Sequence, residues 1–76
     1  MAKLELYGAA RCPHTQEMRE WLEWSRRAFV EYDVEADPAA RQRLRLLDAT
    51  LHTVPVLVED GKIAQIGWQG RGCTVE

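Results

Sequence analysis

Hydrophobic and polar residues in the first half of the chain follow two periods, one typical of strands and one of helices. Residues 3–7 alternate between polar and apolar, which predicts a short strand with Leu4 and Leu6 turned inward. Residues 13–27 place apolar side chains at helical spacing and charged ones mostly toward water. Residues 29–34 are predicted to form a second strand, so this half of the chain predicts a β-α-β unit.

The second half of the chain predicts one more helix, two strands and a loop. Asp37 followed by Pro38 is a typical helix start, because aspartate caps free amides and proline fits the first helical position. Asp60 followed by Gly61 is a strong signal for a hairpin turn. The predicted helix, two strands and glycine-rich loop are residues 38–48, 54–58, 62–66 and 67–72.

Together these elements predict an α/β fold with a four-stranded mixed sheet and the chain order β-α-β-α-β-β. We expect the β-α-β portion to be parallel and right-handed, and the final hairpin to be antiparallel. Four residues follow the glycine-rich loop, so any C-terminal helix is expected to be truncated. Because the chain has 76 residues, we expect residues 1–76 to form one small domain.

Composition and charge narrow the classes of partner. The net charge of −2 gives no electrostatic case for binding nucleic acid or a membrane surface. The sequence has no signal-peptide h-region and no long apolar span, so a cytoplasmic location is expected. In a reducing compartment, two cysteines far apart in sequence indicate catalysis or metal binding more than a permanent crosslink.

Cys12 lies directly after the first predicted strand and directly before the first predicted helix. Free backbone amides and the positive end of the helix dipole favour a thiolate at such a junction. Pro13 fits the first helical position without losing a hydrogen bond, and Arg11 adds positive charge. Cys12 is therefore the candidate nucleophile, expected to be ionised near neutral pH and reachable from solvent; the alternative is a buried structural cysteine.

Three short segments carry a resemblance to a known family. They are Cys12-Pro13-His14-Thr15, Thr53-Val54-Pro55 and Ile66-Gly67-Trp68. In this order they resemble the C-P-Y-C, T-V-P and I-G-G motifs of the glutaredoxins, which have the thioredoxin fold. The chain is also similar to a group of short bacterial glutaredoxin-like proteins, some of which carry selenocysteine as the nucleophile. The resemblance covers nearly the whole chain and implies a cis peptide bond before Pro55.

The sequence departs from the family pattern at positions that matter for activity. Thr15 stands where the second active-site cysteine is usual, so its hydroxyl can only donate to the Cys12 sulfur or bond to the backbone. Ala9 replaces a lysine that helps to hold glutathione. Trp68 replaces the second glycine of I-G-G, and it either walls the site or covers core that the shortened C-terminus leaves bare.

The resemblance also implies which residues hold a substrate. Val54 offers its backbone to a bound cysteinyl group, as the edge of a strand would. Arg41 is a candidate anchor for a glutathione carboxylate, and Arg71 is a second candidate in the glycine-rich loop. His14 is a candidate for tuning the thiolate, with a solvent-facing spacer as the alternative. The other candidates for substrate contact are Arg11, Pro13, Pro55 and Trp68.

Cys73 is the candidate resolving thiol. In the predicted sheet the first and last strands both end at the edge where Cys12 lies. Gly70 and Gly72 allow the backbone to turn sharply after the last strand. An inward-folded loop would bring Cys73 within disulfide distance of Cys12, whereas the alternative is a tail thiol without function.

The residues leave three functions open. The first is a thiol–disulfide oxidoreductase that acts on glutathione or protein disulfides and requires no resident cofactor and no metal. The second, implied by single-thiol members of the family, is a carrier of a [2Fe–2S] cluster bridging two subunits and two glutathiones; the proline after Cys12 argues against it. The third is a binding module without turnover. A homodimer is also expected, because the shortened C-terminus leaves apolar surface uncovered.

Overall fold

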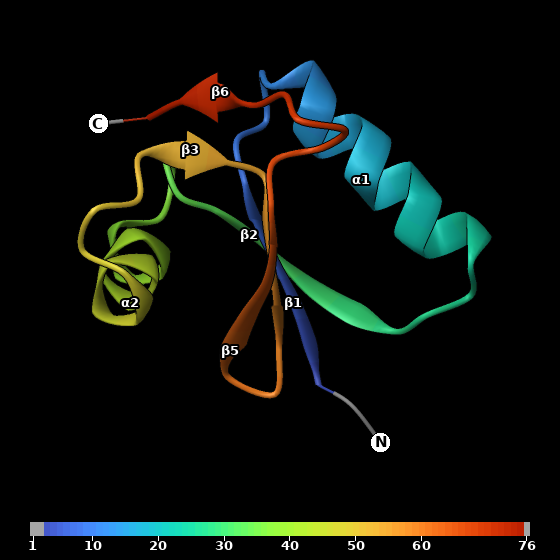
Figure 1. Ribbon diagram of the computed structural model, residues 1–76, viewed down its shortest axis with the longest axis horizontal. Helices are drawn as coiled ribbons and strands as arrows, with labels where there is room; N and C mark the ends of the chain where they lie inside the picture. Colours follow the sequence, from blue (N-terminus) through green and yellow to red (C-terminus); the bar gives the residue numbers. More distant parts are fainter. Residues whose placement is uncertain (1–2, 76) are drawn as a thin grey trace.

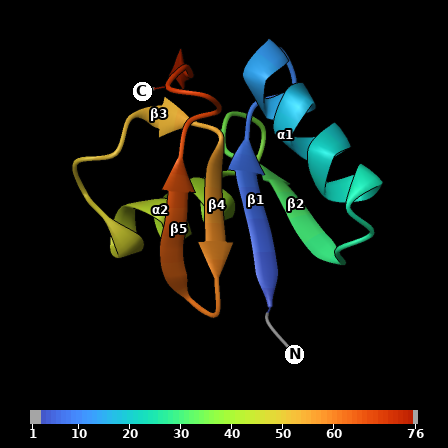
Figure 2. The ribbon, with the colours of Figure 1, turned by 45° about the vertical axis from the view of Figure 1, so that its right-hand side comes forward.

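The computed structural model describes residues 3–75. Its elements are β1 (Leu4–Gly8), α1 (Pro13–Trp24), β2 (Phe29–Asp33), α2 (Pro38–Leu47), β3 (Thr53–Val54), β4 (Val56–Glu59), β5 (Lys62–Ile66) and β6 (Cys73–Thr74). β3 pairs with β6 in a two-stranded sheet (Figure 1), and the other four strands form one sheet in the order β2-β1-β4-β5 (Figure 2). The predicted four-stranded mixed sheet of an α/β fold is therefore confirmed.

Strand directions follow the prediction. β1 runs parallel to β2 and antiparallel to β4, which in turn is antiparallel to β5 (Figure 2). The turn between β4 and β5 places Asp60 at φ 53° and Gly61 at φ 79°. Positive φ at both central residues is the geometry of a type I′ turn, which matches the twist of the two strands that it joins.

The sheet is covered on both faces, so the prediction of a single buried face for β1 was wrong. We predicted one inward face, but all five residues of β1 are buried. α1 covers one face of the sheet and α2 covers the other (Figure 1). The core on the α1 side consists of Leu4, Leu6, Met18, Leu22 and Leu57. The core on the α2 side includes Tyr7, Val34, Leu44, Val56 and Val58.

The first helix ends earlier than its apolar pattern predicts. α1 ends at Trp24 rather than near residue 27. Arg26 has a left-handed φ of 58°, and its N–H bonds to the carbonyl of Glu23. A left-handed residue often closes a helix, but it is usually glycine, so an arginine at this position does not indicate a helix end.

Asp37 begins α2 as predicted. Its carboxylate accepts hydrogen bonds from the backbone N–H groups of Ala39 at 3.0 Å and Ala40 at 3.4 Å. Pro38 fills the first helical position, where an N–H would have no partner in the helix. The capping side chain of Asp37 and the following Pro38 therefore both determine where α2 begins.

Replacing this cap is expected to weaken the fold modestly. Asp37→Ala leaves two amides without their acceptor, so we expect the unfolding free energy to fall by about 1 kcal/mol. Asp37→Asn is the matched control, because its side-chain oxygen also caps and the loss should be small. Denaturant unfolding followed by circular dichroism measures both; equal losses in the two variants would contradict the capping role.

The predicted strand over residues 54–58 is divided into two. The Val54–Pro55 peptide bond is cis, and it separates β3 from β4. Proline has no N–H to donate to a ladder, so the chain leaves the main sheet at this point. β3 pairs instead with β6, in the segment that was predicted to be only a loop and a short stub.

Within residues 3–75, no helix follows β5. Trp68 packs against Trp21 of α1, with ring centroids 5.6 Å apart, and lies against the core on that side. Of the two roles considered for Trp68, the contact supports covering the core. None of the helices in the described part of the chain is long and apolar enough to cross a membrane.

Candidate functional site

Both cysteines of the sequence are joined in one disulfide. Cys12 is the N-cap of α1, and Cys73 is the first residue of β6. Their Cα atoms are 6.0 Å apart, within the usual range for a disulfide, and 61 residues separate them in sequence. The C-terminal segment therefore folds inward and places Cys73 beside Cys12.

The backbone around Cys12 fixes its sulfur at the amino end of α1. The N–H of Cys12 bonds to the carbonyl of Ala9 at 3.0 Å, which closes a tight turn after β1. The carbonyl of Cys12 accepts from the N–H groups of Thr15 and Gln16, and Pro13 is the first helical residue. The first turn of α1 holds no acidic residue, so nothing in it competes for the positive end of the helix dipole.

Thr15 braces this turn through a hydrogen bond to the backbone. Its side chain is completely buried, and its Oγ1 accepts a hydrogen bond from the N–H of Ala9 at 3.3 Å. A Cβ built on Gly8 would lie 2.7 Å from the same oxygen, so β1 and α1 can approach this closely only because residue 8 is glycine. Thr15 thus holds the strand-to-helix junction through a bond to the backbone, one of the two contacts considered for it.

The burial of Cys12 corrects our expectation of a sulfur open to solvent. Cys12 is only 1 % exposed, whereas Cys73 is half-buried. The Cys12 sulfur lies 4.0 Å from the carbonyl oxygen of Val54, and Cys12 belongs to the same core as Val54 and Val75. In the disulfide form, the C-terminal segment covers the sulfur, so its displacement must accompany access to Cys12.

The cis bond and the strand that precedes it form the second wall of the site. Val54 is paired with Cys73, and Thr53 with Thr74, in antiparallel register. The N–H of Val75 continues this pairing with a 2.7 Å hydrogen bond to the carbonyl of His52. The backbone edge that we predicted to receive a substrate is therefore occupied by the end of the same chain.

The charged candidates are arranged differently from the prediction. Arg11 makes a two-point ion pair with Glu35, at 3.1 and 2.8 Å, so its charge is balanced there instead of serving Cys12. Arg11 and Arg41 line a groove of about 560 Å³, which also borders Thr74 and Val75. The groove runs beside β6, and Glu35, which pairs with Arg11, also lines it.

The structure also places the other predicted site residues, which are Pro13, His14, Pro55 and Arg71. The His14 Nδ1 lies 3.1 Å from a carboxylate oxygen of Glu17, in the first turns of α1. Pro13 is exposed at the helix start, and Pro55 is buried behind the site. Arg71 is exposed, and its backbone closes a turn with Trp68 through two hydrogen bonds of 2.6 and 2.9 Å.

Sequence reasoning missed Val75, which packs the C-terminal segment into the core, and Glu35, which pairs with Arg11. Val75 is only 6 % exposed and Glu35 holds Arg11, yet neither was singled out. The apolar Val75 two positions after Cys73 is the signal that could have been used, because that spacing puts both side chains on one face of a strand.

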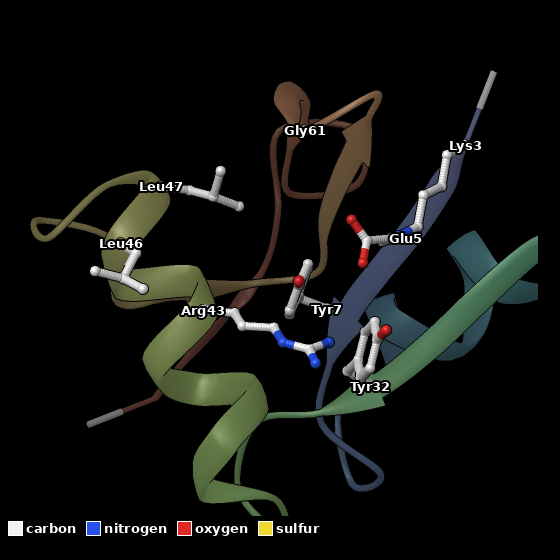
Figure 3. A pocket seen from close by; sticks show the side chains of 8 residues that line it. All are labelled: Lys3, Glu5, Tyr7, Tyr32, Arg43, Leu46, Leu47 and Gly61. Carbon is white, nitrogen blue, oxygen red and sulfur yellow. The ribbon is translucent and has the colours of Figure 1, made fainter.

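A separate cavity lies away from the disulfide, between α2 and β1 (Figure 3). It measures about 420 Å³, and no cysteine lines it. The rings of Tyr7 and Tyr32 stack there at 5.1 Å, and the Arg43 guanidinium lies 5.2 Å from the Tyr32 ring centre. Burial, and then the nearby Glu5 carboxylate, raises the pKa of Tyr7. None of the predicted site residues lines this cavity.

With this geometry in view, comparison with known proteins identifies the family. Residues 4–64, most of the chain, match the family model described as Glutaredoxin. The chain belongs to the glutaredoxin family. Its thioredoxin-type fold and the recognition made from its three motifs are thereby confirmed. A comparison with curated protein sequences finds no significant match.

Solved structures share the fold of this chain. A variant of the thioredoxin-like protein BC3987 is 36% identical, with a TM-score of 0.75, and the alignment covers 91% of this chain and 86% of that one. Glutaredoxin 1 from Francisella tularensis is 23% identical, with a TM-score of 0.63 and coverage of 87% and 84%. A glutaredoxin from Archaeoglobus fulgidus is 22% identical, with a TM-score of 0.73 and coverage of 91% and 78%. The last two show similarity of fold.

Proposed function

We propose that this glutaredoxin is a thiol–disulfide oxidoreductase, with Cys12 as the nucleophile and Cys73 as the resolving thiol. The observation that carries the proposal is the disulfide between the N-cap of α1 and the first residue of β6. The amino end of a helix stabilises a thiolate, and the thiolate is the form that attacks disulfides. A second thiol within bonding distance then completes the reaction without a resident cofactor or metal.

In the reduced protein, the Cys12 thiolate attacks one sulfur of a substrate disulfide. The substrate S–S bond breaks, one half leaves as a thiolate that takes a proton from solvent, and the other half stays bonded to Cys12. The Cys73 thiolate then attacks the Cys12 sulfur, and the second half of the substrate leaves and is protonated. Two electrons have passed from the two cysteines to the substrate, and two external thiols, such as glutathione, restore the starting state.

The substrates that we propose are glutathione mixed disulfides or protein disulfides. Arg41 borders the groove beside β6 and supplies positive charge suited to a carboxylate of a peptide-like substrate. Ala9 provides no ammonium where family members often have lysine. We therefore infer that any anchor for a glutathione carboxylate falls to Arg41, because Arg11 is already paired with Glu35.

Trapping the mixed disulfide tests this mechanism. The Cys73→Ser variant, reduced and then mixed with glutathione disulfide, is expected to gain the mass of one glutathione on Cys12 and to retain it. The wild-type chain should pass through the same adduct and end as the internal disulfide. Mass spectrometry of acid-quenched intact protein follows both reactions.

Cys12→Ser is the matched control, since it leaves Cys73 as the one thiol. We expect it to react slowly, at the rate of an ordinary cysteine, because Cys73 does not sit at a helix amino end. Faster adduct formation at Cys73 than at Cys12 would reverse the two roles and refute the proposal.

A further inference from the structure

β6 is held in the way that a sheet edge holds a separate peptide. Its residues pair with β3 in antiparallel register, and Cys73 lies opposite Val54 while bonded to Cys12. The backbone pairing extends one residue further, from the Val75 N–H to the His52 carbonyl at 2.7 Å. Backbone pairing of this kind supplies affinity, and side chains at alternate positions supply selectivity.

The side chains around Cys73 define what this edge accepts. A Cβ built on Gly72 would lie 2.7 Å from the carbonyl oxygen of Val54, so the residue before the cysteine must lack a side chain. Val75, two residues after the cysteine, is buried in the core with 6 % exposure. Thr74 between them is exposed, so the edge places no demand on that position.

We propose that residues 72–75 are a tethered substrate segment: the β3 edge accepts an extended peptide with glycine before its cysteine and an apolar residue two positions after it, and β6 competes for that edge. The proposal rests on the proposed function, because it names the substrate class of the Cys12 site. When the Cys12–Cys73 disulfide is reduced, β6 loses its covalent hold, and a matching peptide from another molecule can take its place.

The bonding step balances without an added oxidant. The Cys12 thiolate attacks one sulfur of a peptide disulfide dimer, and the S–S bond of the dimer breaks. One peptide remains on Cys12 as a mixed disulfide. The other leaves as a thiolate and takes a proton from solvent, so the disulfide bond has moved and no net oxidation has occurred.

The test uses the full-length Cys73→Ser chain, whose tail cannot form a disulfide. The probe is the disulfide-linked dimer of Gly-Arg-Gly-Cys-Thr-Val, the sequence of residues 70–75. Intact mass spectrometry at equilibrium gives the exchange constant for adduct formation on Cys12. Replacing the glycine before cysteine with alanine, or the valine with serine, should lower that constant about tenfold. Replacing the threonine with alanine should change it less than about twofold.

Competition by the tail is tested in the protein itself. Cys73→Ser with Gly72→Ala should form several times more adduct than Cys73→Ser alone, because its own tail no longer fits against Val54. Cys73→Ser with Thr74→Ala is the matched control and should behave like Cys73→Ser. Equal adduct from the glycine and alanine peptides, or equal adduct from the two tail variants, would overturn the proposal while leaving Cys12 an active nucleophile. No adduct with any disulfide would overturn the proposed function as well.

Discussion

Reducing the Cys12–Cys73 disulfide is expected to lower the unfolding free energy by about 4 kcal/mol. The bond joins residues 61 positions apart in a chain of 76, so it restricts most of the unfolded chain. Without it, the unfolded state regains the entropy of an open loop. A domain of this size is stable by roughly 4–11 kcal/mol, so the loss is a large share of the total.

Guanidinium unfolding of the oxidised and reduced chains, followed by circular dichroism, measures this difference. The Cys12→Ala/Cys73→Ala chain controls for direct effects of the reductant, and its unfolding midpoint should not depend on whether reductant is present. It should unfold near the midpoint of the reduced wild-type chain. Coincident midpoints for oxidised and reduced wild-type protein would show that the disulfide does not stabilise the fold.

Gly8→Ala is expected to reduce the unfolding free energy by roughly 2–3 kcal/mol. Gly8 is the last residue of β1, and a methyl group there overlaps the buried side chain of Thr15. Since Thr15 is fully buried, it cannot swing into solvent, so β1 and α1 must separate. That separation moves Cys12, which follows directly, and we expect slower adduct formation at its sulfur.

A double-variant cycle isolates the contact. Thr15→Ala alone removes the hydrogen bond to the Ala9 N–H and should destabilise the chain. In Gly8→Ala/Thr15→Ala, the second substitution makes room for the first, so the combined loss should be smaller than the sum by about 1–2 kcal/mol. Additive losses would mean that the two side chains do not meet.

Features with local causes could be predicted from the sequence. The start of α2 at Asp37 and Pro38 follows from capping, and the turn at Asp60 and Gly61 follows from their tolerance of positive φ. The placement of Cys12 at the start of α1 has the same kind of cause, because a strand ends and a proline-led helix begins there. These features depend on neighbours in sequence, which the sequence displays directly.

Features that depend on distant segments could not be predicted. β6 is two residues long, which is too short to show an alternation of polar and apolar residues. It forms because it pairs with β3, about 20 residues earlier in the chain. The burial of Cys12 depends on that same pairing. The direction of the Arg11 side chain depends on Glu35, which the fold brings near. The position of Cys12 and its closeness to Cys73 were therefore predicted, but the occupied edge was not.

The contact between Trp21 and Trp68 supplies a built-in optical reporter. Trp68 lies five residues before Cys73 in the terminal segment, while Trp21 is fixed on α1. Any shift of that segment alters the surroundings of both indoles and hence their emission. Trp24, at 82 % exposure, contributes a constant background. Rapid-mixing measurements of tryptophan fluorescence can therefore follow the redox state of the protein without an attached dye.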